Sequence, residues 1–144
     1  MLERVHVKAS IARNAETIRK LHAQIHSTFE RRSDGPEALA AWKQACTTFH
    51  ASYDALAFPG GLSAAFERLA DGDMATAEAA IAYLEIHPYF FRSQYNATRF
   101  MRALKKFQLR SDLQRRFDVI REAAQQRKRV RTHASNQAMQ RTAR

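Results

Sequence analysis

Cysteine, glycine and proline are all scarce in this chain of 144 residues. The single cysteine, Cys46, cannot form an internal disulfide or a metal cage built from several cysteines. Only four glycines and three prolines are present, so few positions interrupt regular structure. The β-branched residues are few and scattered, and no long segment alternates apolar with polar residues. We therefore predict no β-strands.

Long apolar runs are also missing. Nothing approaches the roughly 18 consecutive apolar residues that a membrane-spanning helix requires. The first ten residues contain charged positions but no apolar stretch of the kind found in a signal peptide. We therefore expect no membrane association and a location in the reducing cytoplasm.

Good helix formers dominate the residues that are present, chiefly Ala, Leu, Arg, Gln and Glu. Apolar residues make up 45% of the chain, and nine Phe, four Tyr and one Trp can furnish a core. The length suits one domain. We predict an all-α fold: a compact bundle of five or six helices in a single domain over residues 1–131. Residues 132–144 lack core anchors and are expected to form a disordered, mobile tail.

Apolar residues that recur every three or four positions mark six helices. We expect them at about 3–31, from Pro36 to the turn at 58–61, and then at about 62–70, 74–87, 88–107 and 111–130. Asp73 is the expected N-cap of the fourth helix, and Ser111 and Gln114 have the spacing of a capping box. The second helix has the most regular apolar seam and is expected to be the centre of the core. This seam contains Leu39, Trp42, Cys46, Phe49, Tyr53 and Leu56.

The formal charge of +10 is unevenly distributed along the chain. Residues 1–32 carry seven basic and three acidic side chains, whereas residues 33–91 carry two basic and eight acidic ones. Residues 92–144 carry fifteen basic and three acidic side chains. Such asymmetry indicates nucleic acid, an acidic protein partner, or self-association between unlike ends.

One candidate catalytic set is Cys46, His50 and Asp54, which lie four residues apart in one column of the second helix. A nucleophile, a base and an orienting carboxylate are the ingredients of cysteine hydrolysis. However, a thiol in an apolar seam is a poor nucleophile, and mid-helix amides are not free to form an oxyanion hole. We prefer a core cysteine beside a surface His–Asp pair, and we assign no catalytic residue.

One candidate metal site consists of His22 and His26, which are also four residues apart on a helix. Such a pair can chelate a divalent ion, but the glutamate of the HExxH motif is absent, because Ala23 follows His22. His6 and His87 supply no obvious third ligand. Packing against Ile18 and Ile25 explains His22 equally well, so we predict no metal site and no cofactor.

The most informative segment begins at Pro88 and continues through the fifth helix. At 100° per residue, four cations form one stripe opposite the apolar positions, with two aromatic residues beside it. The stripe contains Arg92, Arg99, Arg102 and Lys106, and the aromatic residues are Phe91 and Tyr95. Cations beside exposed aromatic rings are typical of surfaces that bind nucleic acid or acidic peptides. The alternative is a solvated helix face whose aromatic residues are covered by the first helix or by the loop 58–61.

The last predicted helix is also basic, but its arginines surround the apolar stripe on several sides. This arrangement indicates a diffuse positive field and not a shaped binding surface. The sequence contains no helix-turn-helix, zinc-finger or ribonucleoprotein motif.

Two resemblances add to this interpretation. The segment Ser135–Ala143 (SNQAMQRTA) resembles the translated end of an integron gene cassette, which implies a mobile bacterial cassette and no particular activity. The body is similar to a small group of uncharacterised bacterial helical proteins in the elements Trp42, Phe49–Asp54, Phe58–Gly61 and Pro88–Ser93. This second resemblance implies an all-helical fold but assigns no site.

These observations favour a non-enzymatic binding or adaptor protein whose basic C-terminal third engages nucleic acid or an acidic partner. One alternative is a structural protein that self-associates into a homo-oligomer through its acidic residues 33–91 and its basic residues 92–131. Another alternative is an enzyme that clamps an anionic small molecule with Arg92 and Arg99.

Overall fold

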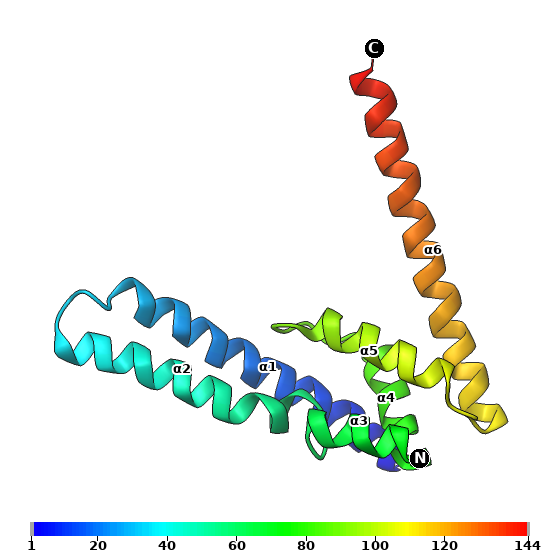
Figure 1. Cartoon of the computed structure of the whole chain (residues 1–144), viewed down its shortest axis with the longest axis horizontal. Coiled ribbons are helices and arrows are strands. Elements are labelled where there is room, and N and C mark those ends of the chain that lie inside the picture. The colour runs from blue at the N-terminus through cyan, green and yellow to red at the C-terminus, as the bar shows by residue number, and fades with distance from the viewer. Residues whose placement is uncertain (1, 144) are drawn as a thin grey trace. The chain divides into compact units, whose positions relative to one another are not determined.

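The computed structural model describes the backbone of residues 2–143 and the side chains of residues 6–143. The model is 83% helical and contains no strand in the described residues, which confirms the predicted all-α fold. The helices are α1 (Leu2–Glu30), α2 (Pro36–Ala57), α3 (Leu62–Ala70), α4 (Met74–Ile86), α5 (Ser93–Lys105) and α6 (Ser111–Thr142). Contacts divide the chain into a first unit, residues 1–108 with α1 to α5, and a second unit, residues 109–144 with α6 (Figure 1).

Helices α1 and α2 form an antiparallel pair, joined by a tight turn (Figure 1). Gly35 precedes α2 with a φ of 131°, a conformation that side chains with a Cβ rarely adopt, and Pro36 occupies the first turn as predicted. Asp34, which could also have capped α2, lies before this glycine and makes no side-chain cap. The glycine at position 35 therefore allows the turn after α1, and the proline at position 36 starts α2.

The seam of α2 is not the centre of the core, contrary to the sequence expectation. Of its six members only Phe49 is buried, whereas Leu39, Trp42, Cys46, Tyr53 and Leu56 are half-buried. Helix α2 makes its main contact with one neighbour, α1. A helix with one main partner buries only a narrow stripe along most of its length, and solvent reaches the edges of that stripe.

Helix α4 is instead the centre of the first unit. It contacts α1, α3 and α5, and its buried residues surround the helix. They are Thr76, Ala77 and Ala80 to Leu84. The small side chains of Ala77 and Ala80 allow neighbouring helices to approach closely. Asp73 caps this helix as predicted, because its carboxylate accepts hydrogen bonds from the amide and the hydroxyl of Thr76.

Aromatic rings fill the space around α4. The ring of Phe100 on α5 lies 4.8 Å from that of Phe58 and 5.1 Å from that of Tyr83, measured between centroids. The Phe66 ring on α3 stacks on Phe100 at 4.8 Å. Aromatic pairs at such distances stabilise a core beyond the area that they bury. This cluster fixes α5 against α3 and α4.

The fifth helix begins later than expected. The sequence predicted a helix over 88–107, but residues 87–92 form a loop, and α5 begins at Ser93. His87 and Arg92, at the two ends of this loop, are the positive-φ residues other than glycine among those described, with φ of 54° and 67°. Such conformations cost about 1–3 kcal/mol each and persist only where the surroundings impose them. Pro88 disfavours helix at His87, and the Ser93 hydroxyl accepts a hydrogen bond from the amide of Phe90.

The second unit is one long helix. The irregular tail expected for residues 132–144 is instead helical as far as Thr142, and Arg144 lies outside the described residues. Ala, Gln, Arg, Lys and Met favour helix without any packing, which apolar periodicity cannot register. Leu113 and Phe117 are buried, whereas residues 125–143 are all exposed.

The start of α6 also differs from the expectation. Arg110 is its N-cap residue and no side chain caps the helix, so the predicted capping box of Ser111 and Gln114 does not form. The side-chain amide of Gln114 instead donates a hydrogen bond to the Asp118 carboxylate, one turn further along α6. No helix in the described part of the chain has the length and apolar character needed to cross a membrane.

Candidate functional site

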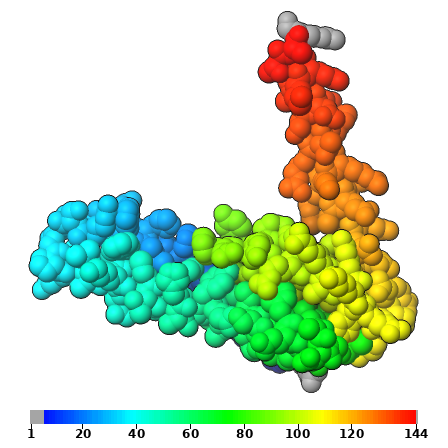
Figure 2. Space-filling view, viewed as in Figure 1, coloured from blue at the N-terminus to red at the C-terminus, as the bar shows by residue number. Residues whose placement is uncertain are grey.

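The predicted basic stripe lies on one exposed face of α5. We call it the basic face, and it contains Arg92, Tyr95, Arg99, Arg102 and Lys106, all of which are exposed. Its members are three or four residues apart, so they lie on the side of α5 opposite the buried Ala97 and Leu104. Figure 2 shows this part of the chain, coloured yellow-green to yellow, uncovered on the visible surface of the first unit.

No acidic side chain among residues 6–143 pairs with the basic face. From Ile86 to Ser111 the chain contains no Asp or Glu. None of the four cations forms an ion pair with any described residue. The guanidinium and ammonium groups are therefore available to an external anion.

Aromatic rings hold two of the guanidinium groups. The Arg99 guanidinium carbon lies 3.8 Å from the centroid of the Phe66 ring and 5.8 Å from that of Tyr95. The Arg92 guanidinium carbon lies 4.7 Å from the Tyr95 centroid. Cation–π contacts of this kind restrict the arginine side chains without occupying their N–H donors. The face is therefore partly ordered before any ligand arrives.

The two aromatic residues singled out from the sequence are both exposed, Phe91 by 47% and Tyr95 by 53%. They differ in their surroundings. The Phe91 ring stacks on His22 of α1 at 5.0 Å and lies 5.8 Å from the ring of Phe49. The sequence left open that the first helix covers these aromatic residues. Helix α1 does cover part of the Phe91 ring. The Tyr95 ring instead lies beside the guanidinium groups of Arg92 and Arg99.

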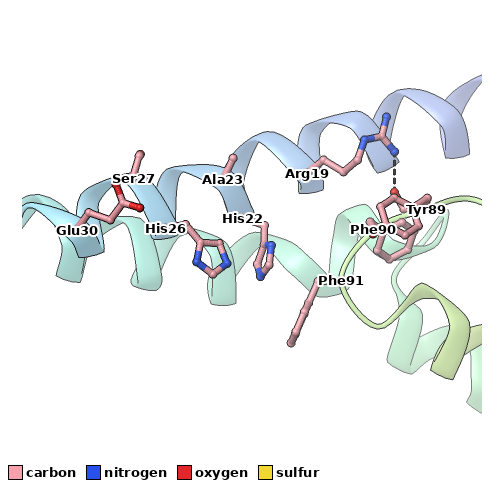
Figure 3. A pocket seen from close by; sticks show the side chains of 9 residues that line it. All are labelled: Arg19, His22, Ala23, His26, Ser27, Glu30, Tyr89, Phe90 and Phe91. Atoms are coloured by element: carbon pink, nitrogen blue, oxygen red, sulfur yellow. Dashed lines mark hydrogen bonds between the residues drawn. The ribbon is translucent and has the colours of Figure 1, made fainter.

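The loop of residues 87–92, which we call the aromatic loop, has three hydrogen bonds between its backbone and side chains of the surrounding helices. Arg19 Nη1 donates to the Tyr89 carbonyl at 2.6 Å, the contact drawn in Figure 3. The Tyr53 hydroxyl donates to the Phe91 carbonyl at 2.7 Å, and the Phe90 amide donates to Ser93 Oγ at 3.1 Å. Helices α1, α2 and α5 each contribute one of these contacts.

The three aromatic residues of this loop point in different directions. Phe90 is buried and lies 6.3 Å from the Tyr83 ring in the core. Tyr89 is 81% exposed, and Phe91 lies between these extremes. One residue therefore anchors the loop while its two neighbours remain at the surface.

A cavity of about 630 Å³ lies between α1 and the aromatic loop (Figure 3). Tyr89 and Phe91 line it from the loop, and Arg19, His22, His26 and Glu30 line it from α1. Aromatic walls with a few polar groups at the edge are the usual composition of a small-ligand site. We call this cavity the loop pocket.

The charge of the basic face also acts on Tyr53, behind the loop. Burial raises the pKa of the Tyr53 hydroxyl above its ordinary value. The hydrogen bond from Asn96 and the positive charge of Arg92 partly oppose that effect. Tyr53 thus stays protonated at neutral pH and can donate to the Phe91 carbonyl.

The column of Cys46, His50 and Asp54 does not form a catalytic set. Asp54 Oδ1 accepts hydrogen bonds from the Ser63 amide at 3.0 Å and from the Ser63 hydroxyl at 2.6 Å. The Asp54 carboxylate therefore binds the first turn of α3. The surface His–Asp pair expected from the sequence does not form. The His50 ring packs edge-on against Phe49 instead.

The histidine pair of α1 lies at the loop pocket. The His22 and His26 rings meet edge to face at 4.7 Å, and His22 also lies 5.6 Å from Phe49. Within residues 6–143, no three His, Cys, Asp or Glu side chains are grouped so that they could hold a metal ion. The aromatic contacts of His22 account for its position.

Sequence reasoning identified the basic face but missed the loop pocket and the contribution of Phe66. Arg19 and Tyr89 are 70 positions apart, and no local pattern indicates that they meet. The only available signal was Pro88 followed by three aromatic residues, a combination that is unusual inside a helix. Comparisons with protein-family models, curated proteins and solved structures find no match to this chain.

Proposed function

We propose that this protein is a non-enzymatic nucleic-acid-binding protein that contacts phosphates through its basic face. One observation carries the proposal. Four cations lie along one face with an exposed tyrosine among them, and none of the four is paired with an acidic side chain that the structure describes. A stripe of this kind on one face is the electrostatic footprint of nucleic-acid binding.

The dimensions of the face support a phosphate backbone as the ligand. Arg92 and Lys106 are 14 positions apart, which corresponds to about 21 Å along a helix. One nucleic-acid strand carries a phosphate about every 3.4 Å of helix axis, so the face spans about six phosphates. Four long, flexible cations can reach four of them. A compact anionic substrate would engage only one end of such a stripe, which favours a polymer over a small molecule.

The test is a titration with duplex and single-stranded oligonucleotides across salt concentrations near 0.15 M. Four neutralised phosphates predict a slope of about −3.6 in a log–log plot of affinity against salt for duplex DNA. Replacing both Arg99 and Arg102 with glutamine should reduce the slope by about half.

The matched control removes the same charge from α6 through Arg115→Gln and Arg121→Gln. Equal weakening in the two double variants would contradict the proposal, because net charge alone would then drive binding. Absence of binding at 0.15 M salt would also contradict it. Salt-dependent sedimentation of the free protein would then favour self-association between residues 33–91 and 92–131, and capture of an acidic protein would favour a protein partner.

A further inference from the structure

The loop pocket and the basic face are continuous along the chain. Phe91 lines the pocket, and the next residue, Arg92, is the first cation of the basic face. Tyr95 follows one helical turn later. The end of the basic face at Arg92 is therefore one residue along the chain from a residue that lines the pocket.

The walls of the loop pocket suit a flat, aromatic ligand. Tyr89 and Phe91 line the pocket with exposed rings, and Tyr89 is the freer of the two, with 81% of its surface exposed. The His22 ring already stacks on one face of Phe91, with the centroids 5.0 Å apart and an interplanar angle of 22°, and so holds that ring in place. The cavity of about 630 Å³ is within the roughly 300–1,000 Å³ typical of small-ligand sites. Ring faces of this kind stack on nucleobases regardless of the base sequence.

The rim of the pocket offers groups that match the edge of a base. The Glu30 carboxylate accepts hydrogen bonds, the Arg19 guanidinium donates them, and the His26 ring can do either. Arg19 uses one nitrogen for the Tyr89 carbonyl, which fixes the guanidinium at the rim while other N–H groups remain (Figure 3).

The aromatic loop is set in place before a ligand binds. Its backbone accepts hydrogen bonds from α1 and α2, and Phe90 anchors it in the core. A base entering the pocket would therefore meet rings that are already oriented, and little ordering would oppose binding.

We propose that the loop pocket receives one unpaired nucleobase, which contacts the rings of Tyr89 and Phe91, and that the ligand is therefore single-stranded RNA or DNA. This inference rests on the function proposed above. In a duplex the bases are paired and stacked inside the helix, so a duplex engages the basic face but leaves the pocket empty. The pocket thus gives single strands an advantage that charge does not supply.

The experiment compares a 12-nucleotide single strand with the corresponding duplex at 0.15 M salt, using wild-type protein, Phe91→Ala and Tyr89→Ala. The wild type should bind the single strand more tightly than the duplex. Each variant should lose about tenfold or more in affinity for the single strand, as expected for one lost stacking contact, and should bind the duplex unchanged. Oligomers of uridine and of deoxythymidine should show the same pattern.

Phe29→Ala is the matched control. Phe29 is 41% exposed and has its own cation–π contact with Arg32, but it does not line the pocket. This variant should bind both ligands like the wild type. Because Tyr89 is much more exposed than Phe91, Tyr89→Ala keeps the test valid even if Phe91→Ala disturbs packing.

A second readout uses single strands that carry one fluorescent 2-aminopurine. Its emission should change on binding to the wild type, and the change should be lost in Tyr89→Ala. If both aromatic variants bind single strands like the wild type while the Arg99 and Arg102 double variant weakens binding, the base pocket is wrong and the basic face stands. If no nucleic acid binds at 0.15 M salt, the proposed function itself fails.

Discussion

The Tyr53 hydroxyl donates a hydrogen bond of 2.7 Å to the backbone carbonyl of Phe91, 38 residues further along the chain. The same hydroxyl accepts a hydrogen bond of 3.0 Å from the buried Asn96 amide. One oxygen atom therefore connects α2, the aromatic loop and α5. The position of the loop pocket relative to the basic face depends on this connection.

Tyr53→Phe should destabilise the protein and loosen the loop. The substitution removes the partner of the exposed Phe91 carbonyl and of the buried Asn96 side-chain amide, and a buried polar group that loses its partner costs about 1–3 kcal/mol. Urea denaturation should show the loss in free energy of unfolding. Tyr95→Phe is the control, because the Tyr95 hydroxyl is at the surface, and equal stability of the two variants would show that the connection contributes nothing.

Phe49→Ala should be far more damaging than Trp42→Ala, although both residues belong to the same α2 seam. Phe49 is buried and contacts His22, Tyr53 and Phe91, so we expect a cost of about 3–5 kcal/mol.

The half-buried Trp42 contacts Phe29 near the turn end of the α1–α2 pair, and we expect about 1–2 kcal/mol for its loss. Chemical denaturation of the two variants measures the difference. An equal loss in free energy of unfolding for the two variants would mean that the α1–α2 pair is packed as well near its connecting turn as it is near the core.

Stability should fall at alkaline pH because of Tyr83. Burial raises the pKa of this hydroxyl well above its ordinary value near 10. The unfolded chain releases this proton near pH 10 while the folded chain keeps it, so the stabilising effect is complete below pH 10 and declines above it.

Absorbance at 295 nm during alkaline titration should show delayed ionisation, and unfolding at pH 9 and pH 11 should show the loss of stability. Tyr83→Phe lacks the titrating group and should be less sensitive to pH over that range, even though it also loses the hydrogen bond to the Ser93 carbonyl. An unchanged pH dependence in that variant would assign the effect to other groups.

Removing residues 132–144 should leave the melting temperature within a degree or two of the full-length value. All described residues of this segment are exposed, and surface changes usually cost less than about 0.5 kcal/mol. Circular dichroism at 222 nm should nevertheless decrease, because helix α6 loses its last turns. A clear drop in melting temperature would show that the segment docks on the rest of the protein.

The existence and order of the helices were predictable because apolar spacing reports local structure directly. The identity of the central helix was not. The regular seam of α2 indicates one apolar stripe and so one main partner, α1, whereas the buried residues of α4 lie on several sides because α4 contacts α1, α3 and α5. Apolar spacing located both helices, but it did not indicate how many neighbours each helix would have.

The candidate site was predictable to the same extent. Arg99 and Arg102 share a face of α5 because of helical geometry alone, so the sequence was sufficient for them. Arg92 instead lies in the loop before α5, in a left-handed conformation, with its guanidinium over the Tyr95 ring. Phe66 and Arg19 reach the site from α3 and α1, through packing that no local pattern encodes. The loop before α5 depends on left-handed residues at His87 and Arg92, which are not glycines and so give no sequence signal.

The central position of α4 also has a consequence for synthesis of the chain on the ribosome. Its apolar surface is covered by α1 and α3 but also by α5, which is translated later. Until the chain has emerged as far as Leu104, one side of α4 has no partner and is available to chaperones. The same stretch of translation also completes the basic face, which ends at Lys106.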